Sequence, residues 1–336
     1  MLPLRELRLD ERLQLASALR WTDTANAMLP KRHENPKPWL VDADGILDSR
    51  YLPDAVFDAQ WDAIVVDPAL KEELLSQGVL NFTLRPRVPR AVVPLHGIIL
   101  LVGPPGTGKT SLARGLASRI ADAVRGLGTF RYLEVEPHAL ASAALGRSQK
   151  AVTELFGRTI AERADAPLIV LLDEVETLAA DRSKMSLAAN PIDVHRATDA
   201  VLAQLDHLAE QHTNILFIAT SNFPEAIDEA LVSRADLVRT IGLPTSEACR
   251  SILLSTLRAL ALEYPSLRAL EDDADVKKAA TVCSGLDGRQ IRKVVISACA
   301  QRKDLALDPS RLTGADVLAA AKAAKAEQKK GKEKRR

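Results

Sequence analysis

Apolar runs alternate with helix-periodic stretches through the middle of the chain. The runs at 98–102 and 168–172 are continuously apolar, as buried strands of a parallel sheet are. Between the runs, apolar residues recur three or four positions apart, most clearly at 193–210. We expect strands at 98–102, 130–135, 168–172, 215–219 and 237–241. The alternation predicts an α/β fold around a parallel sheet of five strands.

The two ends of the chain have different patterns. Beyond residue 244 only helical periodicity remains, with Ser246 as the expected cap of a helix beginning at Glu247 and further helical runs ending near Ala321. Residues 30–39 are polar and rich in proline, as an exposed linker is. We therefore predict an N-terminal region and linker, a large α/β domain, a small helical domain and a basic flexible tail. Their expected bounds are 1–55, 56–244, 245–321 and 322–336.

Positive charge is concentrated in the final segment. Residues 322–336 hold eight lysines and arginines against two glutamates. Such a segment is either an arm that binds nucleic acid or a partner, or a solvated terminus. Because it contains no aromatic residue to stack on bases, we favour the solvated terminus.

Composition narrows the class of protein. With 336 residues, 47% hydrophobic content and a formal net charge of +1, the chain is neither disordered nor a polyanion binder as a whole. Its three cysteines lack metal-ligand spacing, and no apolar run approaches the length of a membrane span. Acidic residues lie among the leucines of the first 21 residues, unlike a secretory or transit signal. These features predict a cytoplasmic protein without a membrane partner.

The strongest motif is GPPGTGKT at Gly103–Thr110, between the first expected strand and a helix-periodic run. Its glycines allow backbone N–H groups to face phosphates, and the helix N-terminus adds partial positive charge. Lys109 is expected to neutralise the β- and γ-phosphates and Thr110 to ligate Mg²⁺. The motif predicts binding of a nucleoside triphosphate. The expected contacts are Pro105, Gly106, Thr107, Gly108, Lys109, Thr110 and Ser111.

Two carboxylates follow the expected strand at 168–172. The strand delivers Asp173 to the carboxyl edge of the sheet beside the phosphate loop, where it can hold Mg²⁺. Glu174 is then placed to orient or deprotonate the water that attacks the γ-phosphate. A kinase or small GTPase is not expected to have this Asp-Glu pair, so the pair favours hydrolysis coupled to mechanical work.

Three further residues are candidates for contact with the terminal phosphate. Asn222 ends the strand after Asp173, where its amide can bond both the γ-phosphate and the attacking water, although asparagine also forms turns. Arg234 either projects into the nucleotide of a neighbouring subunit or forms a surface salt bridge with Asp236. Arg289 opens a helix of the small domain and is expected to reach the γ-phosphate from there.

Taken together, these motifs resemble the AAA+ ATPases. The segments LLDEVETL, HRATDAVLAQLD, TSN, SRAD, IGLP and GLDGR are similar to those of the pachytene checkpoint (thyroid-receptor-interactor-like) family. The likeness extends over about residues 61–302. An arginine at position 289, where many AAA+ remodellers have an acidic residue, also favours this family.

The resemblance implies a ring-shaped homohexamer that hydrolyses ATP with Mg²⁺ and pulls HORMA-domain proteins from closed to open states. Its bacterial members belong to anti-phage signalling systems. On this likeness Val65 and Val66 flank the adenine, Arg234 is the finger that acts on the neighbouring subunit, and Arg289 is a second sensor. The pore loop corresponds to Ala144 and Leu145, where the family has a Trp-Phe pair, so a weaker grip on a threaded chain is expected.

Two other functions remain open on the sequence. An AAA+ loader or switch could act on nucleic acid through the basic tail, although no basic patch interleaved with aromatics supports this. A scaffold that binds ATP without turnover is a weaker alternative, because the residues expected for hydrolysis are all present. We therefore predict a protein remodeller with nucleic acid as an unlikely partner.

Overall fold

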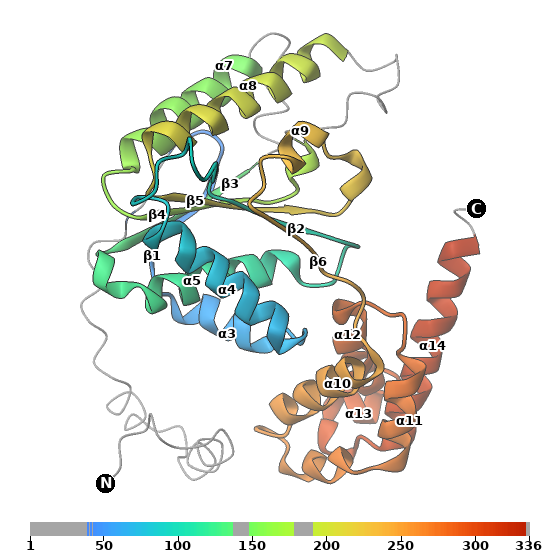
Figure 1. The fold of residues 1–336 in the computed structure, drawn as a ribbon. Helices are drawn as coiled ribbons and strands as arrows, with labels where there is room; N and C mark the ends of the chain where they lie inside the picture. Colours follow the sequence, from blue (N-terminus) through green and yellow to red (C-terminus); the bar gives the residue numbers. More distant parts are fainter. Residues whose placement is uncertain (1–38, 40, 42, 137–147, 178–190, 334–336) are drawn as a thin grey trace, which may run out of the picture.

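The computed structural model describes residues 39, 41, 43–136, 148–177 and 191–333 (Figure 1). The expected pore-loop residues, Ala144 and Leu145, lie outside this part of the chain. Within it, no helix has the length and apolar character needed to cross a membrane.

A six-stranded sheet forms the centre of the larger part, in the order β1-β3-β4-β5-β2-β6. All neighbouring strands are parallel except β1 and β3. The five expected strands are therefore confirmed. The strands are β1 (Ile46–Leu52), β2 (Ile98–Val102), β3 (Phe130–Val135), β4 (Leu168–Leu172), β5 (Ile215–Ser221) and β6 (Leu237–Thr240).

The sixth strand, β1, was not predicted. It pairs antiparallel with β3 at the edge of the sheet, and it lies within the segment 1–55 that we assigned to an N-terminal region and linker. Its sequence, ILDSRYL, carries three consecutive polar residues, and only Leu52 is fully buried. An edge strand with one exposed face has no continuous apolar run, so the pattern that identified the other strands was absent.

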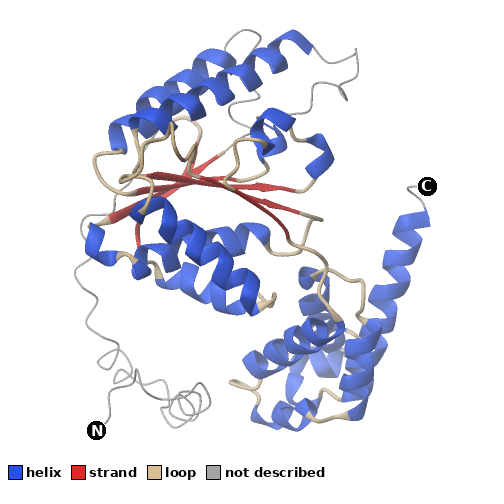
Figure 2. Cartoon of the chain, viewed as in Figure 1, coloured by secondary structure: helices blue, strands red, loops and turns tan. Residues whose placement is uncertain are grey.

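Helices cover both faces of the sheet, as Figure 2 shows. In β2 the side chains of Ile98, Leu100 and Val102 pack into one core and those of Ile99 and Leu101 into the other. This alternation follows from the two-residue period of a strand. The first core lies under α7 (Ser148–Glu154) and α8 (Pro191–Gln211), and the second under α3 (Ala55–Ala63), α4 (Pro68–Thr83) and α5 (Lys109–Ala123).

A separate helical part follows β6 and has its own hydrophobic core. Thr245 caps its first helix by accepting from the N–H of Ala248, so the cap is one residue before the predicted Ser246. The core gathers residues between Cys249 and Ala321. The helices are α10 (Ser246–Leu260), α11 (Ala274–Val282), α12 (Gly288–Ala300), α13 (Lys303–Leu307) and α14 (Gly314–Glu333).

The last helix also corrects the expected flexible tail. α14 continues to Glu333, through most of the segment 322–336. Lys325 Nζ donates to the carbonyl oxygen of Ser284 at 2.5 Å, and Gln328 Nε2 donates to that of Gly285 at 2.5 Å. The run AAKAAKAEQKK consists of strong helix formers, and its propensity outweighs the charge on which the prediction rested.

Candidate nucleotide-binding site

The phosphate loop lies between the carboxyl end of β2 and the amino end of α5. Gly106 and Gly108 have φ angles of 81° and 94°, a left-handed conformation that glycine adopts without strain. A Cβ atom on Gly108 would lie 2.6 Å from Cδ1 of Ile64, so a larger residue would displace the end of the Ile64 side chain. The loop therefore leaves the N–H groups at the start of α5 facing the cavity, as anion binding requires.

Lys109 is held at the mouth of this loop. Its Nζ atom donates to the carbonyl oxygens of Gly103 at 2.8 Å and Pro104 at 2.9 Å, and to Oδ1 of Asn222 at 2.8 Å. Burial lowers the pKa of the Lys109 ammonium, although nearby carboxylates oppose the shift. The structure thus brings two of the predicted site residues into direct contact across neighbouring strands.

Thr110 and Asp173 also meet at the carboxyl edge of the sheet. The Thr110 hydroxyl donates to Asp173, with Oγ1 to Oδ1 and Oδ2 distances of 2.9 and 3.2 Å. A second hydroxyl, that of Thr220, donates to Oδ1 of Asp173 and accepts from the backbone N–H of Glu174. Asp173 is thereby fixed in position by threonines from α5 and β5.

Glu174 adopts an unusual backbone conformation directly after Asp173. Its φ of 52° is the only positive φ of a non-glycine residue in the described chain. Asn222 Nδ2 donates to Oε1 of Glu174 at 3.0 Å, and the Asn222 backbone N–H donates to Oε1 of Glu176 at 3.1 Å. Left-handed backbone at such a residue is strained and is common at functional sites.

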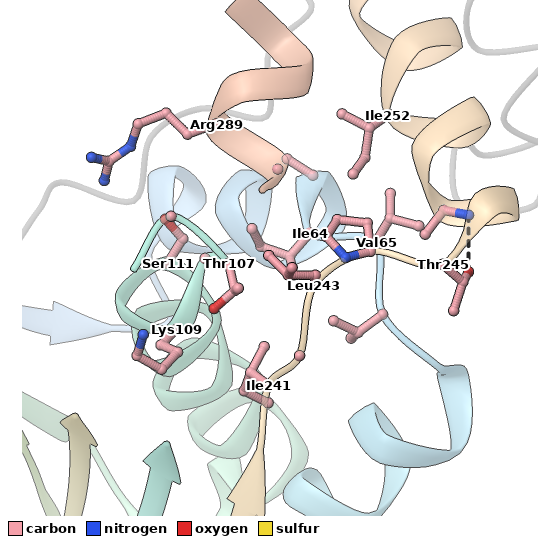
Figure 3. Close-up of a pocket in the computed structure, with 18 of the residues that line it drawn as sticks. Ile64, Val65, Thr107, Lys109, Ser111, Ile241, Leu243, Thr245, Ile252 and Arg289 are labelled. Atoms are coloured by element: carbon pink, nitrogen blue, oxygen red, sulfur yellow. Dashed lines mark hydrogen bonds between the residues drawn. The ribbon is translucent and has the colours of Figure 1, made fainter. Parts of the chain in front are cut away.

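These groups border a cavity of about 850 Å³ between the sheet and the helical part (Figure 3). Lys109 and Ile241 lie on one side of it, while Ile252 and Arg289 enter from the helical part on the other. All the phosphate-loop residues singled out in the sequence line this cavity. So do Val65, Val66, Glu174 and Asn222.

The apolar end of the cavity joins the two parts of the molecule. Val65 packs against the helical core, whereas Ile64 and Val66 pack against the sheet core. Leu243 and Ile252 complete the apolar lining on the other side of this end of the cavity. Such a slot between aliphatic side chains suits the flat face of a nucleobase.

Arg289 is exposed at the start of α12, where it lines the cavity. Asp287 caps this helix in a capping box with Gln290, and the N–H of Arg289 donates to the carbonyl oxygen of Gly106 at 3.4 Å. The sequence analysis missed Arg292, one turn later, whose Nη2 donates to the carbonyl oxygen of Ala63 at 2.5 Å. The start of α12 thus contacts both the phosphate loop and the base-side segment.

Arg234 occupies a different place. It precedes β6, which runs parallel to β2, so it lies by the amino ends of these strands, whereas the phosphate loop follows the carboxyl end. The length of β2 separates the two edges, about 16 Å. Arg234 is not among the described residues that line the cavity. Its guanidinium cannot reach a nucleotide bound by its own chain without leaving this position.

The expected alternative partner of Arg234, Asp236, is used elsewhere. Its carboxylate accepts the backbone N–H groups of His96, Gly97 and Ile98 at 2.9, 2.6 and 3.1 Å. Arg234 pairs instead with Asp206 of α8, at 2.9 and 2.7 Å. This correction could not be read from the sequence, because the ion pair joins residues 28 positions apart on different elements.

Comparison with known proteins agrees with this geometry. Residues 99–243 match the family model described as "ATPase family associated with various cellular activities (AAA)". CD-NTase-associated protein 6 from Pseudomonas aeruginosa is 54% identical over 293 residues, which cover 87% of this chain and 96% of the relative. The pachytene checkpoint protein 2 homolog of Rattus norvegicus is 35% identical over 268 residues.

The chain belongs to the pachytene checkpoint family of AAA+ ATPases. The match to the rat member covers 72% of this chain but only 61% of that protein. The solved structure of C. elegans PCH-2 superposes on this AAA+ fold with a TM-score of 0.67 at 29% identity, covering 86% of this chain and 77% of the other. A chain in the structure of the E. coli MS115-1 HORMA:CdnC:Trip13 complex has the same fold, with a TM-score of 0.66 at 18% identity, covering 83% and 95%.

Three further residues, which the sequence analysis did not single out, contact the predicted site residues. Thr220 donates to the carboxylate of Asp173, Glu176 accepts from the backbone N–H of Asn222, and Asp206 pairs with Arg234. The contact of Thr220 with Asp173 could have been predicted from the sequence. Thr220 lies at the carboxyl end of β5, and the parallel neighbour β4 ends at the same side of the sheet, just before Asp173.

Proposed function

We propose that the chain binds ATP with Mg²⁺ in the cavity between sheet and helical part and hydrolyses it to remodel a HORMA-domain protein. The observation that carries the ATPase part is the contact of Lys109, Asn222 and Glu174 in one hydrogen-bonded series. Lys109 is the first residue of α5, and Asn222 and Glu174 follow the carboxyl ends of β5 and β4, so the three groups converge at the phosphate loop.

The proposed roles follow from position and charge. Backbone N–H groups at the start of α5 and the Lys109 ammonium bind the phosphates, while Val65 and Val66 flank the base. Asn222 orients Glu174, whose carboxylate accepts a proton from the attacking water. Arg289 contacts the terminal phosphate from the helical part.

The donor chemistry beside the loop suits magnesium. Thr110 and Asp173 offer a hydroxyl and a carboxylate within 2.9 Å of each other, and Mg²⁺ prefers such hard oxygen ligands together with phosphates. When bound, the ion would neutralise charge on the phosphate oxygens. Thr220 holds Asp173 in this orientation from the neighbouring strand.

Arg234 supports an assembly in which neighbouring chains share a site. Its place at the opposite edge of the sheet from the phosphate loop suits a finger that enters the nucleotide site of the next copy in a ring. We propose a homohexamer on the likeness to AAA+ relatives. The pore-loop roles proposed for Ala144 and Leu145 rest on the sequence alone.

Motion between two domains would convert hydrolysis into work. We propose that the sheet part, 56–244 together with β1, and the helical part, from 245 through α14, rotate against each other about the bound nucleotide. The contacts of α12 with Gly106 and Ala63 give the helical part a direct connection to the phosphate loop and the base-side segment.

The substrate is inferred from the relatives. One relative is named for association with a CD-NTase, and a similar fold occurs in a complex with HORMA and CdnC. We therefore propose that this chain opens a HORMA-domain protein within a bacterial anti-phage signalling system.

The test is steady-state ATPase activity of the purified protein, alone and with a HORMA-domain partner. Glu174→Gln should bind ATP and hold the partner in a stable complex, but turn over at least about 100-fold more slowly. Turnover at the native rate in this variant would refute the role of Glu174. Activity that ignores the HORMA protein but rises with single-stranded DNA would favour a nucleic-acid switch instead.

A further inference from the structure

The guanidinium of Arg234 donates to three acceptor atoms of its own chain. Its Nε and Nη2 atoms donate to the two carboxylate oxygens of Asp206 at 2.9 and 2.7 Å, and Nη1 donates to the carbonyl oxygen of Ala230 at 2.7 Å. A bidentate pair fixes the plane of the guanidinium as well as its position. The side chains of Arg234 and Asp206 are 23% and 36% exposed, so the pair lies at the surface but is not fully solvated.

The Arg234 guanidinium keeps N–H donors that these contacts do not use. A guanidinium has five N–H donors, and two of them are on each terminal nitrogen. Asp206 uses Nε–H and one N–H of Nη2, and Ala230 uses one N–H of Nη1. Among the described residues no other group accepts from this guanidinium, so one N–H remains on each terminal nitrogen. A bidentate contact with two phosphate oxygens needs this number of donors.

Asp206 does not depend on Arg234 alone for neutralisation. Arg90 Nη2 approaches its Oδ1 atom at 3.8 Å. The hydrogen bond from Arg234 holds the pKa of Asp206 below its usual range against an opposing effect of burial, and the charge of Arg90 acts in the same direction. The Asp206 carboxylate therefore has a second cation, Arg90, beside it when Arg234 also engages another group.

We propose that Asp206 is a positioning residue for hydrolysis, which orients Arg234 so that its two remaining N–H donors reach the phosphate of a neighbouring subunit. This inference rests on the proposed action of Arg234 on the next copy. Hydrolysis reaches its full rate only while Asp206 fixes the plane of the Arg234 guanidinium.

The first test is steady-state kinetics at saturating ATP and at protein concentrations where assembly is complete. Asp206→Asn should lower kcat about 10- to 100-fold, because a small displacement of a positioned group can cost this much. The affinity of this variant for ATP should stay within about twofold of the native value, because the nucleotide site lies at the carboxyl ends of the strands and Asp206 holds Arg234 at their amino ends. Asp206→Glu should recover part of the rate.

A matched control lies one turn further along α8. Glu210 pairs with Arg90 at 3.1 Å, and among the described residues its contacts do not include Arg234. Glu210→Gln should keep kcat within about twofold, because exposed pairs contribute little. An equal loss in Glu210→Gln and Asp206→Asn would mean that general damage to this surface explains the effect, and would overturn the inference.

Mixing subunits separates a defect in the finger from a defect in the subunit's own site. Asp206→Asn keeps its own hydrolytic residues, and Glu174→Gln keeps its finger, so a mixed assembly should hydrolyse ATP faster than the sum of the two variants alone. If the mixture shows no gain, Asp206 does not act through the finger. Circular dichroism of each variant should match the native chain.

Arg234→Ala distinguishes this inference from the proposed function. If Arg234→Ala is inactive while Asp206→Asn has native kcat, the finger stands and the positioning role of Asp206 fails. If Arg234→Ala has native kcat, the shared site itself fails, and the role of Asp206 fails with it.

Discussion

The hydroxyl of Thr220 connects the two acidic residues of the site, because it donates to Oδ1 of Asp173 and accepts from the backbone N–H of Glu174. Thr220 is 1% exposed at the end of β5. One buried side chain therefore fixes both the carboxylate expected to face Mg²⁺ and the strained backbone from which Glu174 projects.

Thr220→Val should impair catalysis without unfolding the protein. Valine has nearly the same shape and suits a strand, but it cannot orient Asp173. We expect kcat to fall about 10-fold or more, as for other residues that orient a metal ligand. Thr220→Ser retains the hydroxyl and is the control, and a native rate in Thr220→Val would mean that Asp173 needs no such support.

Gly106→Ala should weaken nucleotide binding. The φ of Gly106 is 81°, and a Cβ atom there would lie 2.5 Å from the carboxyl carbon of Asp287. The left-handed conformation alone costs alanine about 1–2 kcal/mol, and the contact would push α12 away from the loop. Fluorescence titration with a labelled ATP analogue should show the loss, while Gly126→Ala, with open space around it, should bind normally.

The buried thiol of Cys283 should make stability depend on alkaline pH. Burial raises the pKa of Cys283 from 9.0 to about 12, so its stabilising effect is complete below pH 9.0 and is lost as the pH rises toward 12. Between pH 9 and 11 the native chain should lose up to about 1.4 kcal/mol per pH unit more than Cys283→Ala. Urea unfolding under reducing conditions measures this, and equal pH slopes for both chains would contradict it.

Removing the end of α14 should loosen the start of α12. A chain ending at residue 321 lacks Lys325 and Gln328, which bond the carbonyl oxygens of Ser284 and Gly285 just before Arg289. Amide hydrogen exchange at 284–289 should accelerate about fivefold or more, since a net hydrogen bond is worth about 1 kcal/mol. A chain ending at residue 330 keeps both contacts and should exchange as the native chain does.

The sequence was sufficient for the features that depend on local pattern. Each of the five central strands is a short run of apolar residues, and the phosphate loop is a compact motif between a strand and a helix. Carboxyl ends of parallel strands meet at one edge, which is why Asp173 and Asn222 were expected near Lys109.

The features that were missed depend on contacts between distant segments. β1 has a mixed polar pattern, and it is a strand because β3 offers an open edge. The pairing of Arg234 with Asp206 needs the packing of α8 beside the loop before β6. For α14 the helix propensity was present in the sequence, but charge was given too much weight.

The separation of Arg234 from the phosphate loop has a consequence for how activity responds to dilution. The two lie at opposite ends of the parallel strands. On the proposed function, one copy therefore supplies the phosphate loop of one active site and the arginine of another, and contains no complete active site. Specific ATPase activity should then fall when the protein is diluted below the dissociation constant of the assembly. Any factor that raises the local concentration of the chain would act as an activator.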